Sequence, residues 1–324
     1  ILDGVKADLK KLEVIASISA EDIYKAEEDS DIADVLKTMP KWNPNGRAML
    51  PLTDEWVEHI EDLKSFHRTN GYGMFAKFVA FTWRNEEFVP ITAIDSIRLT
   101  DLKNYEVQRG KVVDNTVAFI SDLPANNVLL YGDRGTGKSS TVHAILNEYK
   151  NRGLRMIEIS KGDINDLTMI REKISDSPMK FIIFIDDLSF DNHDDSFGEL
   201  KAALEGSLSG RQNNTLIYAT SNRRHLIKEN FSDRENDVNR SDTLQEELSL
   251  SDRFGLSITF INPDKKDFED IVQKIATDRG LKSDMEKILF TAEQWARRRG
   301  GRSPRCARQF IDYVESCEKR NIEW

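Results

Sequence analysis

The sequence contains little cysteine and little histidine. Its two cysteines, Cys306 and Cys317, lie eleven residues apart in a segment with a helical pattern. That spacing separates them by about 16 Å along a helix axis, too far for a disulfide bond. The five histidines are scattered and show no metal-ligand spacing. The composition therefore argues against a disulfide scaffold and against a metal centre built from these residues.

Long apolar runs and an excess of basic residues are also missing. No apolar stretch approaches the ~20 residues of a membrane-spanning helix, and no signal-peptide pattern opens the sequence. The 46 Lys and Arg against 56 Asp and Glu give a formal net charge of −10. An acidic total argues against a protein that coats nucleic acid non-specifically, although a local basic patch remains compatible with it. We expect a cytoplasmic protein without a membrane span.

The 324 residues are sufficient for two domains, or for one domain with a small appendage. Three regions differ in pattern. Residues 1–90 read as helical, because Leu2, Val5, Leu9, Leu12 and Ile15 recur at spacings of three and four. Residues 91–262 alternate strand-like and helix-like segments, and residues 263–324 contain helical patterns only. Breaker-rich residues 37–51 and polar residues 229–247 are expected to be loops, the latter alternatively a weak helix.

The middle region predicts a parallel sheet. Apolar runs such as Phe181–Ile185 are typical of central strands that are covered on both faces. Their alternation with helices implies right-handed crossovers and an α/β fold with five parallel strands. The expected strands are Asn127–Tyr131, Arg155–Ile159, Phe181–Ile185, Thr215–Thr220 and Ser257–Phe260, followed by helices Lys265–Arg279, Asp284–Arg299 and Ser303–Asn321.

An aromatic run lies before this region. Tyr72, Phe75, Phe78, Phe81 and Trp83 are spaced by two or three residues. Packing in a core is the first interpretation, and an exposed surface that grips a partner is the alternative.

The chemistry begins with a glycine-rich motif. Residues 132–139 fit G-x-x-x-x-G-K-[ST] at every fixed position, between a strand pattern and a helix pattern. Glycines allow the backbone to wrap a phosphate, and the helix N-terminus supplies positive potential. Lys138 is expected to reach the β- and γ-phosphates of a nucleotide and the Ser139 hydroxyl to bind Mg²⁺. The predicted nucleotide-binding residues are Gly132, Asp133, Arg134, Gly135, Thr136, Gly137, Lys138, Ser139 and Ser140.

A second motif follows about fifty residues later. The apolar run ends in Asp186 and Asp187. A buried strand delivers Asp186 to the carboxyl edge of the sheet, where ligands bind in open α/β folds. Asp186 is therefore predicted to hold Mg²⁺ together with Ser139.

The two motifs and three later residues follow one another in the order seen in AAA+ ATPases, and the sequence therefore resembles that family. Asn222 ends the next strand and matches the position called sensor 1, which helps to position the attacking water. Arg253, in Ser251-Asp252-Arg253-Phe254, matches the arginine finger that such proteins insert into a neighbour's site. Arg305, in Ser303-Pro304-Arg305, matches the lid arginine called sensor 2. The resemblance implies a three-helix lid, ATP and Mg²⁺ as ligands, and head-to-tail self-association.

Residues 91–320 more narrowly resemble a bacterial AAA+ family known as a domain of unknown function. The segments that carry this resemblance are Asn126–Ser140, Phe184–Phe190, Tyr218–Leu226 and Leu248–Leu256. One departure from AAA+ proteins concerns Asp187, because they usually carry a glutamate there that polarises water. Aspartate is one methylene shorter, and misplacing a catalytic group by ~1 Å costs about a hundredfold in rate. Either Asp187 serves through a shifted backbone or turnover is slow.

Two further segments leave alternatives open. Leu99–Tyr105 precedes the first predicted strand, where AAA+ proteins contact adenine, but it is equally compatible with a packed linker. Six arginines lie within residues 297–308. They suit a nucleotide sensor with solvated neighbours, a basic face toward an acidic subunit, or a nucleic-acid patch.

These observations predict a Mg²⁺-dependent ATPase that remodels or loads a macromolecular partner, a protein rather than DNA. Lys138, Asp187, Asn222, Arg253 and Arg305 are its expected catalytic residues. Two alternatives remain: a slow nucleotide-dependent switch that docks a protein through residues 1–90, and a DNA-remodelling ATPase.

Overall fold

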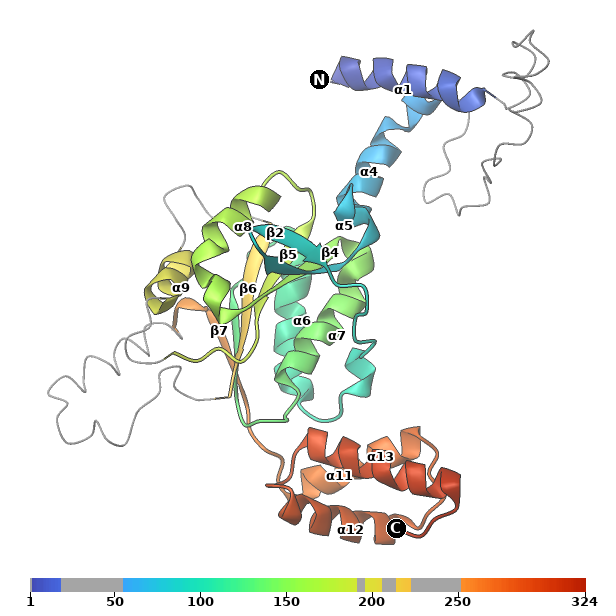
Figure 1. Ribbon diagram of the computed structural model, residues 1–324, viewed down its shortest axis with the longest axis vertical. Helices are drawn as coiled ribbons and strands as arrows, with labels where there is room; N and C mark the ends of the chain where they lie inside the picture. The colour runs from blue at the N-terminus through green and yellow to red at the C-terminus, as the bar shows by residue number, and fades with distance from the viewer. Residues whose placement is uncertain (1, 19–54, 191–195, 206–213, 223–251) are drawn as a thin grey trace, which may run out of the picture. The chain divides into compact units, whose positions relative to one another are not determined.

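The computed structural model describes residues 2–18, 55–190, 196–205, 214–222 and 252–324 (Figure 1). The loops expected at 37–51 and 229–247 lie outside these ranges. Spatial contacts divide the chain into two compact units, Ile1–Thr69 and Asn70–Trp324. The first unit contains helix α1 (Leu2–Ser17), the short 3₁₀ helix η1 (Trp56–His59) and most of α4 (Ile60–Asn70). None of the described helices is long and apolar enough to cross a membrane.

The second unit is built on a seven-stranded sheet in the order β2-β1-β4-β5-β6-β3-β7. Five of its strands are those predicted, and all of them pair in parallel. They are β3 (Val128–Gly132), β4 (Leu154–Ile159), β5 (Lys180–Ile185), β6 (Thr215–Ser221) and β7 (Leu256–Phe260). Strand β3, which leads into the glycine-rich motif, lies between β6 and β7.

Two strands extend the sheet beyond the predicted five, so the five-stranded prediction was wrong. Strands β1 (Ala80–Arg84) and β2 (Glu87–Pro90) form an antiparallel hairpin, and β1 pairs in parallel with β4. The hairpin also corrects the expectation of an all-helical segment over residues 1–90. Its turn residues Asn85 and Glu86 have φ values of 50° and 60°, the backbone that two-residue hairpins favour. Most of the aromatic run packs in the core: Phe75, Phe81 and Trp83 are buried and Phe78 packs against them, whereas Tyr72 is exposed.

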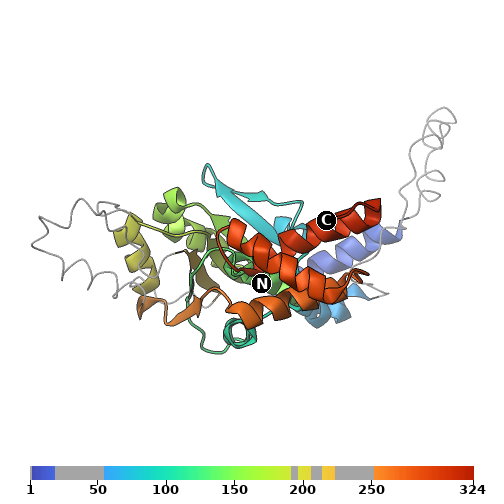
Figure 2. The same cartoon turned by 90° about the horizontal axis from the view of Figure 1, so that it is seen from below.

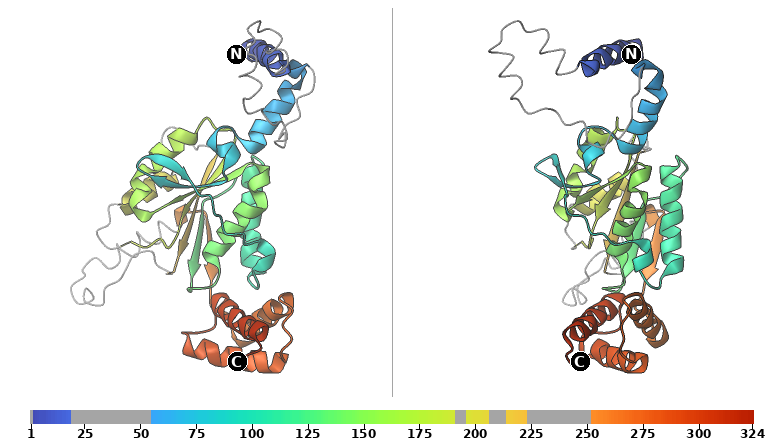
Figure 3. Two further views of the ribbon diagram at one scale, coloured as in Figure 1. Left: turned by 45° about the vertical axis from the view of Figure 1, so that its right-hand side comes forward. Right: turned by 90° about the vertical axis from the view of Figure 1, so that its right-hand side faces the viewer.

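Helices cover both faces of the sheet, as the views in Figures 1 and 3 show. Helices α6 (Glu106–Ile120) and α7 (Lys138–Tyr149) pack on one face, where Val112 and Ile145 are fully buried. Helices α8 (Leu167–Ile174) and α9 (Ser196–Glu205) pack on the other, with Ile170 and Leu200 fully buried. Both faces of the central strands are thus removed from water, which explains their continuous apolar sequences. Four short helices lie in the described connections of this unit: α5 (Met74–Lys77), η2 (Leu99–Asp101), η3 (Lys150–Arg152) and η4 (Lys161–Asp166).

The three predicted C-terminal helices are present and have a core of their own. They are α11 (Lys265–Asp278), α12 (Met285–Arg298) and α13 (Pro304–Arg320), packed side by side in Figure 2. Each begins after a residue whose side chain caps the first turn: Asp264, Asp284 and Ser303. These caps satisfy backbone N–H groups that a helix leaves unpaired, and they explain why the helix starts were readable from sequence.

Candidate nucleotide site

The glycine-rich loop joins β3 to α7, as the motif predicts. Gly132 has φ 126°, and a Cβ there would lie 2.0 Å from the Phe260 carbonyl oxygen of β7. Only glycine fits this close approach. Within the loop, the Thr136 hydroxyl donates to the Asp133 carbonyl at 2.8 Å. The Asp133 carboxylate accepts from the Asn262 N–H at 2.7 Å and ties the loop to the chain after β7.

Lys138, the first residue of α7, is buried with 6% of its surface exposed. Its ammonium donates to the carbonyls of Gly132 (3.0 Å) and Asp133 (2.7 Å) and to Asn222 Oδ1 (3.0 Å). Burial lowers the pKa of Lys138, while the carboxylates of Asp133, Asp187 and Asp186 raise it. The cation is therefore held at the head of the loop by neutral oxygens, with carboxylates nearby.

The two acids lie beside the loop because β6 separates β5 from β3 by one strand. Asp186 Oδ1 accepts from the hydroxyls of Ser139 (2.6 Å) and Thr220 (2.5 Å). Asp187 Oδ1 accepts from Asn222 Nδ2 at 2.6 Å. Lys138, Ser139, both acids and Asn222, which are distant in sequence, thus form one connected group. Thr220 belongs to the same group and was not among the predicted site residues.

Helices α11 to α13, the predicted lid, contribute Arg305 of α13 to the glycine-rich loop. The Arg305 backbone N–H donates to the Gly135 carbonyl at 3.1 Å, and its exposed side chain contributes to lowering the pKa of Lys138 by charge repulsion. Two cations, one from α7 and one from the lid, thus lie at the loop. Arg253 is half-buried and helical, three residues before β7, and the hydrogen bonds described above for the loop, the acids and Arg305 do not involve it. Arg134 is exposed, and Ser140 is half-buried in the first turn of α7.

A pocket of about 360 Å³, including its open mouth, adjoins Gly137. Its walls come from three parts of the second unit: the segment before α6, the loop with the start of α7, and the lid. The lining residues are Asp101, Leu102, Lys103, Asn104, Tyr105, Arg109, Thr136, Gly137, Thr141, Phe260, Ile271, Ile275, Pro304 and Arg308.

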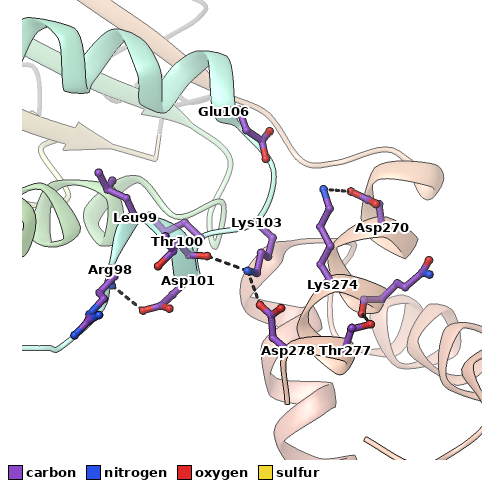
Figure 4. A network of polar contacts seen from close by, with 12 residues as sticks. Arg98, Leu99, Thr100, Asp101, Lys103, Glu106, Asp270, Lys274, Thr277 and Asp278 are labelled. Atoms are coloured by element: carbon purple, nitrogen blue, oxygen red, sulfur yellow. Dashed lines mark hydrogen bonds and ion pairs between the residues drawn. The ribbon is translucent and has the colours of Figure 1, made fainter. Parts of the chain in front are cut away.

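Residues 98–105, which we call the strap, are fixed on two sides. Lys103 Nζ donates to the Thr100 carbonyl at 2.9 Å and pairs with Asp278 of α11 at 2.5 Å (Figure 4). On the other side, the Tyr105 hydroxyl donates to the Ile261 carbonyl at 2.6 Å. Arg109 of α6 donates to the carbonyls of Leu99 and Leu102. The strap is thus a bonded wall of the pocket, joined to the lid by an ion pair.

The arginines at residues 297–308 have different surroundings. Arg297 and Arg302 both bond Glu293, at 3.2 and 2.7 Å, and the hydrogen bond from Arg302 is the main cause that lowers the pKa of Glu293. Arg299 lies over the Trp295 ring, 4.5 Å from its centroid. Arg308 lines the pocket. Arginines that are neighbours in sequence therefore contact different partners: Glu293, the Trp295 ring and the pocket.

The fold and the site together define a class: a P-loop α/β protein of the AAA+ type, with three C-terminal helices. The sequence profile of the family described as "Protein of unknown function (DUF815)" matches residues 76–318. The chain belongs to that family, which confirms the resemblance seen in the sequence. No curated protein matches the chain.

Among solved structures, the chain is similar to RuvB of Thermotoga maritima. A single-residue variant of that protein is 18% identical, with 70% of this chain and 67% of the other covered and a TM-score of 0.48. The structure titled as the Thermotoga maritima RuvB Holliday junction branch migration motor has the same identity and coverage and a TM-score of 0.45. At this identity, the similarity concerns the fold.

Proposed function

We propose that the protein binds ATP with Mg²⁺ at the glycine-rich loop and hydrolyses it. The single observation that supports this most is the connected group formed by Lys138, Ser139, Asp186, Asp187 and Asn222. Lys138 leaves its carbonyl partners for the β- and γ-phosphates, which offer it full negative charge. Arg305 adds a second cation from the lid, and the loop N–H groups of residues 132–140 complete the phosphate site.

The residues fit a magnesium ion. Mg²⁺ prefers oxygen ligands and is commonly held by one or two carboxylates together with substrate phosphates. Ser139 Oγ and Asp186 Oδ1, 2.6 Å apart, offer such oxygens at the end of the loop. Among the described residues no group of three or more His, Cys, Asp or Glu could hold a metal alone. When bound, the ion neutralises phosphate charge.

Asp187 and Asn222 orient the attacking water in this proposal. The carboxylate accepts the proton of the water, and the amide of Asn222 holds that carboxylate in place. The pocket beside Gly137 receives the adenine base of ATP, with the strap as one wall. The shorter acid keeps a slow switch open as the second candidate function, since Asp187 reaches less far than glutamate.

Hydrolysis is proposed to drive rearrangement of a macromolecular client, a protein rather than DNA. The division of the lid arginines between Glu293, Trp295 and the pocket weakens the case for a nucleic-acid face. In the alternative of a slow switch, docking through residues 1–90 is narrowed to residues before the β1–β2 hairpin, because β1 and β2 belong to the sheet. DNA-stimulated turnover with salt-dependent binding would favour the DNA alternative instead.

Arg253 is proposed to act on the nucleotide of a neighbouring copy in a head-to-tail assembly. An arginine supplied in trans contributes about 10³-fold or more to turnover in related chemistry. Arg253→Ala should bind ATP and fail to hydrolyse it, and mixing it with Lys138→Ala should recover activity, since one interface then pairs an intact loop with an intact arginine. Specific activity should also rise with protein concentration. Flat activity across dilution, with no recovery on mixing, would refute the assembly.

The direct test of the nucleotide site is Lys138→Ala. We expect it to abolish ATP binding in a titration with a fluorescent ATP analogue, while circular dichroism remains that of the wild type. A folded variant that binds ATP with wild-type affinity would refute the proposed site.

A further inference from the structure

Thr220 contacts three consecutive residues of the acidic turn that follows β5. Its hydroxyl donates to Asp186 Oδ1 at 2.5 Å and accepts from the Asp187 N–H at 2.9 Å. Its carbonyl accepts from the Leu188 N–H at 2.7 Å. The residue is 2% exposed. Thr220 reaches the turn because β6 lies between β5 and β3. On the β3 side, Thr220 is the register partner of Leu130.

The turn needs such support because Asp187 has a left-handed backbone, with φ 51°. Non-glycine residues rarely adopt this conformation, and aspartate tolerates it better than most. A strained backbone persists only when its surroundings hold it. The bonds from the Asp187 and Leu188 N–H groups to Thr220 flank the strained residue, and they aim its side chain at Asn222, which bonds Asp187 Oδ1 at 2.6 Å.

We propose that Thr220 is a positioning residue, whose hydroxyl fixes both the metal-binding carboxylate of Asp186 and the backbone that presents Asp187. This inference rests on the proposed function. One hydroxyl has one proton, and the bond to Asp186 uses it. Its oxygen is then directed to accept from Asp187, so the two acids are held in a fixed relation to each other.

Two substitutions separate this role from simple packing. Thr220→Val keeps the branched shape and removes both hydroxyl bonds, whereas Thr220→Ser keeps the hydroxyl and removes a methyl group. Three quantities are measured on the full chain: affinity for a fluorescent ATP analogue in EDTA, affinity of the ATP-bound protein for Mn²⁺ by electron paramagnetic resonance, and the turnover number at saturating Mg·ATP.

We expect Thr220→Val to bind the analogue in EDTA within threefold of wild type. Its affinity for Mn²⁺ should fall at least fivefold and its turnover number at least tenfold, while Thr220→Ser stays within threefold of wild type in all three. If the valine variant is unfolded by circular dichroism, Thr220→Ala takes its place, because it removes the same hydroxyl.

The inference is overturned if the valine variant equals wild type in Mn²⁺ affinity and turnover. It is equally overturned if serine is as impaired as valine, since the methyl group then matters, or if metal-free ATP binding is lost with the rest. Failure of the proposed function looks different: the wild type itself then does not bind ATP or shows no Mg²⁺-dependent turnover.

Discussion

Asn222 bonds both Lys138 and Asp187, the proposed general base. Its substitution should therefore separate ATP affinity from turnover. In this structure its amide oxygen accepts from Lys138 at 3.0 Å and its amide nitrogen donates to Asp187 at 2.6 Å. Lys138 must leave Asn222 to reach phosphate. The bond to Asp187 is the one expected to act during hydrolysis.

Asn222→Ala removes both bonds. A hydrogen bond to a charged group contributes about 1.5–3 kcal/mol, and about 1.4 kcal/mol corresponds to a factor of ten. Because Asp187 is exposed, the lower end applies, and the turnover number should fall about tenfold. The dissociation constant for ATP should stay the same or fall up to about tenfold, since the empty site no longer competes for Lys138.

Asn222→Asp is the matched control. It keeps an acceptor for Lys138 but loses the donor to Asp187 and adds a negative charge near phosphate. Turnover should again fall, and ATP should now bind at least tenfold more weakly. Phosphate release at saturating Mg·ATP and titration with a fluorescent analogue measure the two quantities. An Asn222→Ala variant with weaker ATP binding and unchanged turnover would refute the reasoning.

Three further variants test separate contacts. Asp187→Asn, which preserves shape and tolerates the left-handed backbone, should keep Mg·ATP affinity and lower turnover at least tenfold; unchanged turnover would assign the base elsewhere. Lys103→Ala removes the ion pair to Asp278 and should weaken ATP binding about two- to fivefold, the upper half of the ~0–1 kcal/mol range for such pairs, because the Lys103 side chain is only 18% exposed. The reversed pair Lys103→Asp with Asp278→Lys should restore the affinity, and no loss in Lys103→Ala would argue against the strap as a pocket wall. Because the folded-state pKa of Glu293 is lowered, its contribution to stability is present above the ordinary pKa of 4.5 and is lost as pH falls through the folded value. Thermal unfolding of Glu293→Gln should therefore be less sensitive to acid than that of wild type below about pH 4.5, and equal sensitivity would contradict the assignment.

Local patterns were sufficient to predict the glycine-rich loop, strands β3 to β7 and the three C-terminal helices. The glycines and lysine of the motif occur in one kind of loop, between a strand and a helix. Buried parallel strands are continuously apolar, and the three C-terminal helices begin after capping side chains. The hairpin was not predicted, because its turn, Asn85-Glu86, has no glycine and because the aromatic spacing before it suits a helix face as well as a strand.

The role of Thr220 could not be read from the sequence either. It depends on which strand lies between β5 and β3, and on a positive φ at Asp187 that no sequence pattern signals. The same φ value bears on the aspartate that departs from the usual glutamate. Aspartate is among the side chains that best accept this backbone, so the shorter acid and the left-handed turn are compatible with each other.

The β1–β2 hairpin has a consequence for how copies of this chain avoid sticking together. An unpaired edge strand presents free N–H and C=O groups that recruit strands from other molecules, which leads to aggregation. Here β4 is covered by β1, and the outermost strand, β2, has four residues, begins with the charged Glu87 and ends at Pro90. Proline has no N–H to offer and is tolerated at edges. Strand pairing between copies of this chain is therefore disfavoured at the β2 edge of the sheet.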